Sequence, residues 1–206
     1  MSTWRGDLGY SDLIGEHGIS KADPCFDVLG TLDEASAALG LARALAITGY
    51  TKEQILQVQE HLCWMMSELA ARDPVADGHY ILAEHVAWLD EQIHTVEAQV
   101  PRPTAFVAAG NSTAGAALQL ARTMVRRAER LVVRLDNFHT RYLEILAYLN
   151  HLSAYLFSLG RYEDAAAGGE ARSIPFRSPG PRRAAAEEHD GKLAETTQGK
   201  SDSLVA

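Results

Sequence analysis

Residues 118–135, LQLARTMVRRAERLVVRL, combine helical periodicity with a row of arginines. Apolar residues recur there at intervals of three and four, which predicts an α-helix with one buried face. That face consists of Leu118, Ala121, Val125, Ala128, Val132 and Leu135. Arg122, Arg126 and Arg130 are four residues apart, so they share a different face of the same helix.

The arginine row (Arg122, Arg126 and Arg130) predicts a negatively charged partner. Like charges four residues apart repel by roughly 0.2–0.5 kcal/mol per pair in an isolated helix, and Glu129 offsets only part of this repulsion. The planar guanidinium group suits both carboxylates and phosphates. Two alternatives therefore stay open: a salt-bridge network with carboxylates such as Asp33, or a ligand that carries phosphates.

Composition limits the classes of function. The 206 residues are 47% hydrophobic and 22% charged, which is ample for one domain with a full core. A formal net charge of −8 argues against general binding to nucleic acid or anionic membrane. Two cysteines, Cys25 and Cys63, favour a reducing compartment over a disulfide framework. No secretory signal or bilayer-length apolar run is recognised, so we expect a soluble, cytoplasmic protein.

The apolar pattern predicts five helices and no convincing strand. We expect the helices over about 31–47, 51–72, 79–99, 112–136 and 140–162. The first is expected to begin at a capping box formed by Thr31 and Glu34. The predicted fold class is all-α, a five-helix bundle.

Two segments fall outside the helical pattern. Residues 1–30 are punctuated by glycines, which predicts an ordered glycine-rich N-terminal arm rather than a helix. Glycines let backbone N–H groups turn toward an anion, although an ordinary turn-rich terminus has the same composition. Residues 165–206 are rich in Ala, Gly, Pro, Ser, Arg and Glu, which predicts a disordered C-terminal tail. The helical domain is therefore expected to occupy residues 1–164.

Several isolated residues have more than one interpretation. Asn150 lies among apolar and aromatic residues, where a hydrogen-bonded core amide is the commoner case. Phe106 is expected on a loop between helices, packed down as a lid. Carboxylate-bridged metal bundles need two Glu-x-x-His pairs, and Glu91 with His94 supplies one, so no metal site is predicted. Three histidines are expected to be partly exposed helix residues that stand alone: His61, His85 and His151.

Several segments, in this order and spacing, resemble the propanediol-utilisation type of ATP:cob(I)alamin adenosyltransferase. They are the arm Arg5-Gly6-Asp7-x-Gly9, Lys21 with Gly30-Thr31-x-Asp33-Glu34, Phe106 before Gly110, the helix from Ala121 to Arg130, Tyr148-Leu149-Asn150-x-Leu152-Ser153 and Tyr155-Leu156-Phe157. The resemblance covers about residues 3–162.

The resemblance implies a homotrimer of helical bundles with an active site at each subunit interface. Such an enzyme transfers the 5′-deoxyadenosyl group of ATP to cob(I)alamin, with Mg²⁺, and releases triphosphate. By resemblance, the arm residues that bind ATP are Thr3, Arg5, Gly6 and Ser11, with Lys21 at the phosphates. The residues that hold ATP from the neighbouring subunit are Arg126, Glu129, Arg130 and Asn150, with Arg122 in support.

The resemblance also assigns two residues to the chemistry. Asp33 would pair with Arg126 across the subunit interface. Phe106 would press on the lower face of the corrin ring and keep the cobalt four-coordinate. A cobalamin-dependent enzyme that receives the product would be a candidate partner.

The arm departs from the family's usual residues at Trp4, Leu8 and Tyr10, and the segment after Phe106 departs at Ala109 and Asn111. These departures leave open a non-catalytic ATP or cobalamin carrier or regulator of the same fold. A third alternative is a structural helical oligomer whose arginines pair only with carboxylates.

Overall fold

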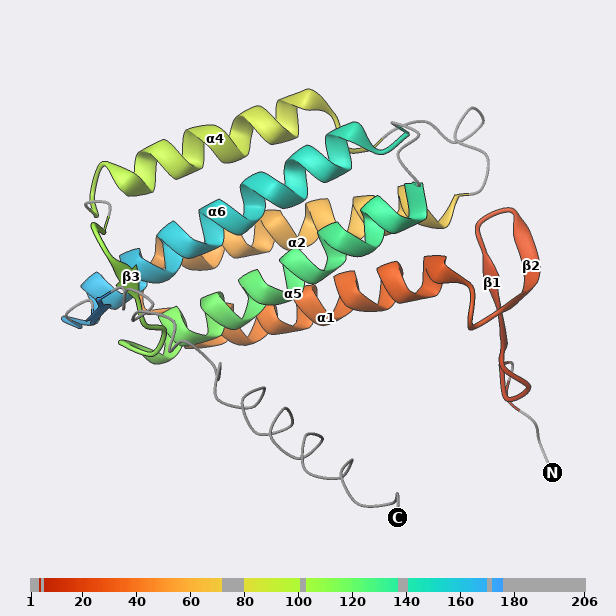
Figure 1. Ribbon diagram of the computed structural model, residues 1–206, viewed down its shortest axis with the longest axis horizontal. Coiled ribbons are helices and arrows are strands. Elements are labelled where there is room, and N and C mark those ends of the chain that lie inside the picture. The colour runs from red at the N-terminus through yellow and green to blue at the C-terminus, as the bar shows by residue number, and fades with distance from the viewer. Residues whose placement is uncertain are drawn as a thin grey trace, which may run out of the picture. The chain divides into compact units, whose positions relative to one another are not determined.

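The computed structural model describes residues 4, 6–71, 80–100, 103–136, 141–169 and 172–175. Its helices are α1 (Pro24–Leu45), α2 (Gly49–Ala70), α4 (Ala83–Glu97), α5 (Thr113–Asp136) and α6 (Leu143–Ala166). Its strands are β1 (Tyr10–Leu13), β2 (Glu16–Ser20), β3 (Phe106–Val107) and β4 (Ser173–Ile174). The prediction of a mainly helical bundle is confirmed (Figure 1).

The helices pack along one another around a single apolar core. α6 contacts both α4 and α5, and α1 contacts both α5 and α2. The predicted inner face of α5 is buried from Leu118 to Val132, and Leu135 packs partly buried against the same core. Tyr148 and Tyr155 of α6 are the largest fully buried side chains. The core thus fixes which faces of α5 and α6 point outward.

α5 and α6 approach closely near the first turn of α5. A Cβ added to Gly115 would collide with the Asp164 carboxylate of α6. The Ser112 hydroxyl donates to Asp164 Oδ1 at 2.6 Å and accepts from the Gly115 backbone N–H at 2.9 Å. Ser112 therefore caps α5 and ties it to α6.

The prediction for the start of the first helix is wrong. α1 begins at Pro24, after the N-cap residue Asp23, whose carboxylate accepts from the Cys25 backbone N–H at 2.9 Å. Thr31 is buried inside the helix, and Glu34 forms an ion pair with Arg127 of α5 instead of closing a capping box. Glycine lowers helix propensity by only about 1 kcal/mol, so Gly30 does not end a helix that packs on the core.

The N-terminal segment contains strands that the sequence pattern did not predict. β1 and β2 form an antiparallel hairpin in which Tyr10 is opposite Ser20 and Ser11 is opposite Ile19. The backbone N–H of Ile14 donates to Ala70 O at 3.1 Å and ties the hairpin to the end of α2. Most residues of both strands are exposed, so neither strand shows the apolar–polar alternation of a half-buried strand.

The C-terminal prediction also needs correction. α6 continues to Ala166, and Ser173–Ile174 pairs antiparallel with Phe106–Val107, so residue 165 does not begin a disordered tail. Residues 176–206 lie outside the described part of the chain. None of the described helices is long and apolar enough to cross a membrane.

Candidate functional site

The arginine row carries the charge repulsion that the sequence predicted. Arg122 is partly buried, and its pKa is lowered by burial and by the neighbouring charge of Arg126. Its Nε donates to the Gln119 side chain at 2.7 Å. Within the described part of the chain, no carboxylate forms an ion pair with Arg122, Arg126 or Arg130. Among the described residues, the arginine row therefore has no carboxylate partner.

A hollow of about 570 Å³ lies against α4, α5 and α6, and we call it the helix hollow. Its size falls in the range of roughly 300–1,000 Å³ that is usual for small-molecule sites. Its lining residues are Asp90, Ile93, His94, Glu97, Arg122, Arg126, Asn150, His151, Ser153, Ala154 and Phe157. The wall from α5 is cationic, and the wall from α4 carries two carboxylates.

Asn150 faces this hollow and does not belong to the core. Its neighbours Tyr148, Leu149 and Leu152 are buried, but Asn150 itself is exposed. The interpretation as a satisfied core amide is therefore wrong. The structure brings Asn150 together with Arg122 and Arg126, which are three of the residues that the resemblance assigned to ATP.

A smaller hollow of about 230 Å³ lies on the N-terminal hairpin, and we call it the arm hollow. It is lined by Gly6, Tyr10, Ser11, Asp12, Gly18 and Lys21. Lys21 Nζ donates to the Gly6 carbonyl at 3.0 Å. Gly6 has a φ of 97°, and a Cβ there would lie 3.0 Å from Lys21 Nζ, so this position needs glycine. Thr3 and Arg5 lie outside the described residues.

The two hollows are separate in one chain. They share no lining residue. Figure 1 shows the β1–β2 hairpin, which carries the arm hollow, beyond one end of the helices that line the helix hollow. Asp33 is exposed on α1, while Glu129 and Arg130 do not line the helix hollow. One chain therefore brings together two partial sets of the predicted site residues.

Phe106 differs from its predicted environment. It lies in β3, pairs with Ile174 of β4, and is 62% exposed. The backbone N–H of Ala108 donates to Arg172 O at 3.0 Å, so the strand pair also holds the following residues. Phe106 is thus a side chain presented outward by a short strand pair, rather than a lid packed onto the chain.

The prediction for the histidines is wrong for the exposure of His61, and none of the three stands alone, since His151 Nδ1 lies 2.6 Å from Asp90 Oδ1. His61 is buried, and its Nδ1 lies 2.8 Å from the Tyr148 hydroxyl. Its ring centroid is 4.8 Å from that of His85, so these two histidines do not stand alone. Burial and the charge of His85 lower the pKa of His61 to about 4. His61 is therefore a neutral core histidine at neutral pH.

Sequence reasoning missed much of the lining of the helix hollow. Helical spacing could have found these residues, because Ala154 and Phe157 follow Asn150 by four and seven positions. Asp90 and His94 have the same four-residue spacing on α4. The missing information was which face of α4 turns toward α5 and α6.

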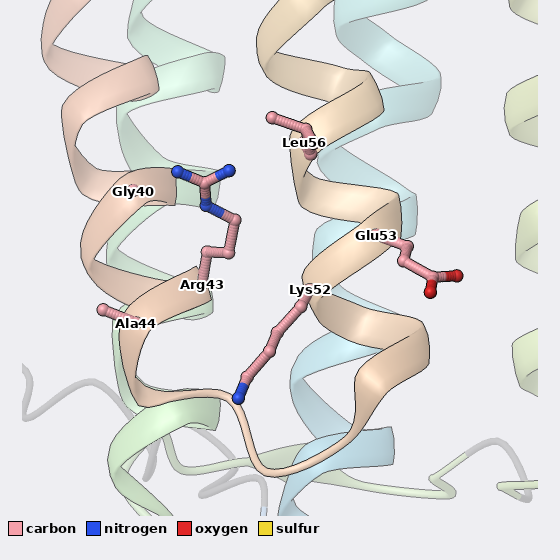
Figure 2. Close-up of a pocket in the computed structure, with 6 residues that line it drawn as sticks. All are labelled: Gly40, Arg43, Ala44, Lys52, Glu53 and Leu56. Carbon is pink, nitrogen blue, oxygen red and sulfur yellow. The ribbon is translucent and has the colours of Figure 1, made fainter.

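A third hollow, of about 450 Å³, lies between α1 and α2. Figure 2 shows that Arg43 and Lys52 approach it from the two helices, while Glu53 points away. Glu53, Leu56, Gly40 and Ala44 complete the lining. It contains none of the predicted site residues.

The cobalamin adenosyltransferase family model matches residues 1–163. This chain belongs to that family. It is 35% identical over 164 residues to corrinoid adenosyltransferase PduO of Citrobacter freundii, and the match covers 79% of this chain but 49% of that protein. It is 32% identical to the human corrinoid adenosyltransferase MMAB, covering 86% and 74% of the two chains. The chain spans about half the length of the PduO relatives that it matches.

Solved adenosyltransferase structures share the fold. A phenylalanine-to-alanine variant of the PduO-type ATP:corrinoid adenosyltransferase from Lactobacillus reuteri, complexed with cobalamin and ATP, superposes with a TM-score of 0.77. It is 27% identical, and the match covers 84% of this chain and 98% of that one. An arginine-to-lysine variant complexed with ATP gives a TM-score of 0.75, also at 27% identity, with 85% and 100% covered.

Proposed function

We propose that this protein transfers the 5′-deoxyadenosyl group of ATP to cob(I)alamin, forming adenosylcobalamin and releasing triphosphate. The observation that carries the proposal is the helix hollow, where Arg122 and Arg126 face Asn150 without a carboxylate ion pair in the described residues. Family membership supplies the reaction, and the related solved structures hold ATP and cobalamin.

The reaction needs no protein base, but it needs ATP and cob(I)alamin to be held in the correct orientation. The cobalt(I) electron pair attacks C5′ of ATP, a cobalt–carbon bond forms, and the C5′–O bond breaks with its electrons leaving on the triphosphate. Holding the two reactants in line can supply roughly 7–11 kcal/mol of the barrier. Arg122 and Arg126 would stabilise the charge that develops on the leaving triphosphate.

The proposed site is completed by a second copy of the chain. The arm exposes large apolar side chains, with Trp4 at 82% and Leu8 at 86% exposed, and such a group of residues is typical of an interaction surface. Lys21 of the arm hollow would then reach the phosphates held in a neighbouring helix hollow. Asp33 would pair with Arg126 across the same interface. A homotrimer with three such interfaces is the assembly that we propose.

Phe106 and Mg²⁺ have proposed places at this site. Phe106 would lie against the lower face of the corrin ring, where an apolar side chain excludes water as the axial ligand. The described residues contain no group of three His, Cys, Asp or Glu side chains that could hold a metal. Mg²⁺ commonly uses one or two carboxylates together with substrate phosphates. It would therefore bind with ATP and offset phosphate charge.

We also propose a cellular compartment and a partner for this enzyme. It would act in the cytoplasm, because a chain with only two cysteines fits a reducing compartment. It would deliver adenosylcobalamin to a cobalamin-dependent enzyme.

An anaerobic assay tests the proposed function. Cob(I)alamin, ATP and Mg²⁺ are combined with the protein under a strong reductant, and the cobalt spectrum is followed. We expect adenosylcobalamin to form only when the protein is present. Folded protein that gives no adenosylcobalamin would overturn the proposal, and ATP binding without turnover would instead favour a non-catalytic carrier.

A further inference from the structure

A histidine and an aspartate form a pair inside the helix hollow. His151 follows Asn150 on α6, and its Nδ1 lies 2.6 Å from Oδ1 of Asp90 on α4. The two side chains are 31% and 50% exposed, so the pair is neither sealed in the core nor loose on the surface. Both residues line the hollow beside Arg126. The proposed reaction does not yet use either of them.

The pair leaves one ring nitrogen available to a ligand. A carboxylate at Nδ1 favours the tautomer that carries its proton there. Nε2 of His151 then accepts a hydrogen bond when the ring is neutral, and donates one when the ring is protonated. Among the described residues, the imidazole has the one polar partner, Asp90. Nε2 is therefore available to a ligand in the hollow.

The surrounding charges make the protonation of this ring depend on what occupies the hollow. The titratable groups that face it are Asp90, His94 and Glu97 of α4, and Arg122 and Arg126 of α5. In the empty site the two arginines disfavour a positive charge on the ring, whereas Asp90 and Glu97 favour one. A triphosphate would neutralise the arginines and attract a proton to the ring, and imidazole is the side chain that changes charge between about pH 5 and 8.

We propose that His151, held by Asp90, takes up a proton when the triphosphate of ATP binds in the helix hollow, and then donates from Nε2 to a phosphate oxygen. The pair would be a positioning device that adds positive charge beside Arg122 and Arg126 when the anion binds. The inference rests on the proposed function, because it takes ATP as the ligand of this hollow.

Titration calorimetry of MgATP into the full-length protein tests the proposal. Binding is measured near neutral pH in buffers with different ionisation enthalpies, and the slope of the observed heat gives the number of protons taken up. We expect the wild type to take up more protons on binding MgATP than the His151→Gln variant does. Its ATP affinity should also fall by up to about tenfold per pH unit above neutrality, relative to that variant.

Three further variants make the result decisive. His85→Gln removes a histidine of α4 that does not line the hollow and should leave the proton count unchanged. Asp90→Asn should lower the proton count, and His151→Arg should keep ATP affinity while losing the extra proton. The same proton count in the wild type and His151→Gln would overturn the inference. An equal proton count would not affect the proposed function if the wild type binds ATP and Arg126→Ala does not. If the wild type binds no ATP, both the inference about His151 and the proposed function are overturned.

Discussion

Arg122 shows at the scale of one residue why the arginine row suits an anionic ligand. Its pKa is lowered by burial and by the charge of Arg126, so the free protein holds this cation in an unfavourable setting. A bound polyanion would offset the repulsion between Arg122 and Arg126. It would also replace part of the hydration that Arg122 loses by burial. The repulsion that the sequence indicated is therefore a source of affinity for phosphate, provided that no carboxylate of this chain occupies the site first.

Replacing Arg126 with alanine should weaken ATP binding strongly. Hydrogen bonds to charged groups contribute about 1.5–3 kcal/mol, so the Kd should rise roughly 10- to 150-fold. The matched control is Arg43→Ala, which removes the same charge from the hollow between α1 and α2 (Figure 2). Calorimetry should show near-normal ATP binding by that control. Equal losses in both variants would mean that net charge, rather than the helix hollow, determines binding.

His61 should make the folded state less stable in acid. Its pKa is about 4 in the fold against an ordinary value of 6.5. Below pH 6.5 the His61 side chain is protonated in the unfolded chain but stays neutral in the folded chain. The free energy of unfolding therefore falls as the pH falls from about 6.5 to about 4. The loss is on the order of 3 kcal/mol.

Denaturation of the wild type and His61→Asn at several pH values measures this contribution of His61. The variant should be less stable at neutral pH but should lose less stability on acidification. The exposed His94, changed to glutamine, is the control and should keep the wild-type slope. Parallel stability curves for the wild type and His61→Asn would contradict the assignment.

At the scale of elements, the sequence predicted α5 well because two signals agreed. Its apolar period identifies the buried face, and Ser112 supplies a cap at the start. The pattern does not predict the N-terminal hairpin because its strands are mostly exposed and lack apolar–polar alternation. It does not predict helix over Pro24–Gly30 because Gly30 resembles a helix break. Local sequence predicts long amphipathic elements, whereas tertiary packing decides the short and glycine-containing ones.

Gly115 lets α5 and α6 approach, and this approach sets Arg126 against Asn150. Gly115→Ala would push the added Cβ into the Asp164 carboxylate and break its bond to Ser112. We expect a destabilisation of about 2–4 kcal/mol. Gly30 has no atom within 4 Å of an added Cβ, so Gly30→Ala should stabilise α1 by about 0.5–1 kcal/mol. Chemical denaturation compares the two, and a Gly115→Ala protein as stable as the wild type would refute this packing account.

At the scale of the whole molecule, the residues proposed to bind ATP lie mainly in two places, the hairpin and the helices α5 and α6. Lys21 and Ser11 line the arm hollow, while Arg126 and Asn150 line the helix hollow. The sequence alone identified residues of both sets through the resemblance. It could not place them in space, because the distance between two hollows and the exposure of Asn150 depend on how the helices pack. The Asp90–His151 pair was invisible for the same reason, since it joins α4 to α6.

Mixing two inactive variants tests most directly whether one active site is assembled from two copies. Lys21→Ala removes the arm lysine, and Arg126→Ala removes the cation of the helix hollow. The two proteins are unfolded together, refolded as mixed oligomers and assayed for adenosylcobalamin. Random mixing at equal amounts should restore about a quarter of the wild-type rate, because an intact arm meets an intact helix hollow at about one interface in four. Mixed oligomers as inactive as either variant alone would contradict a site shared between subunits.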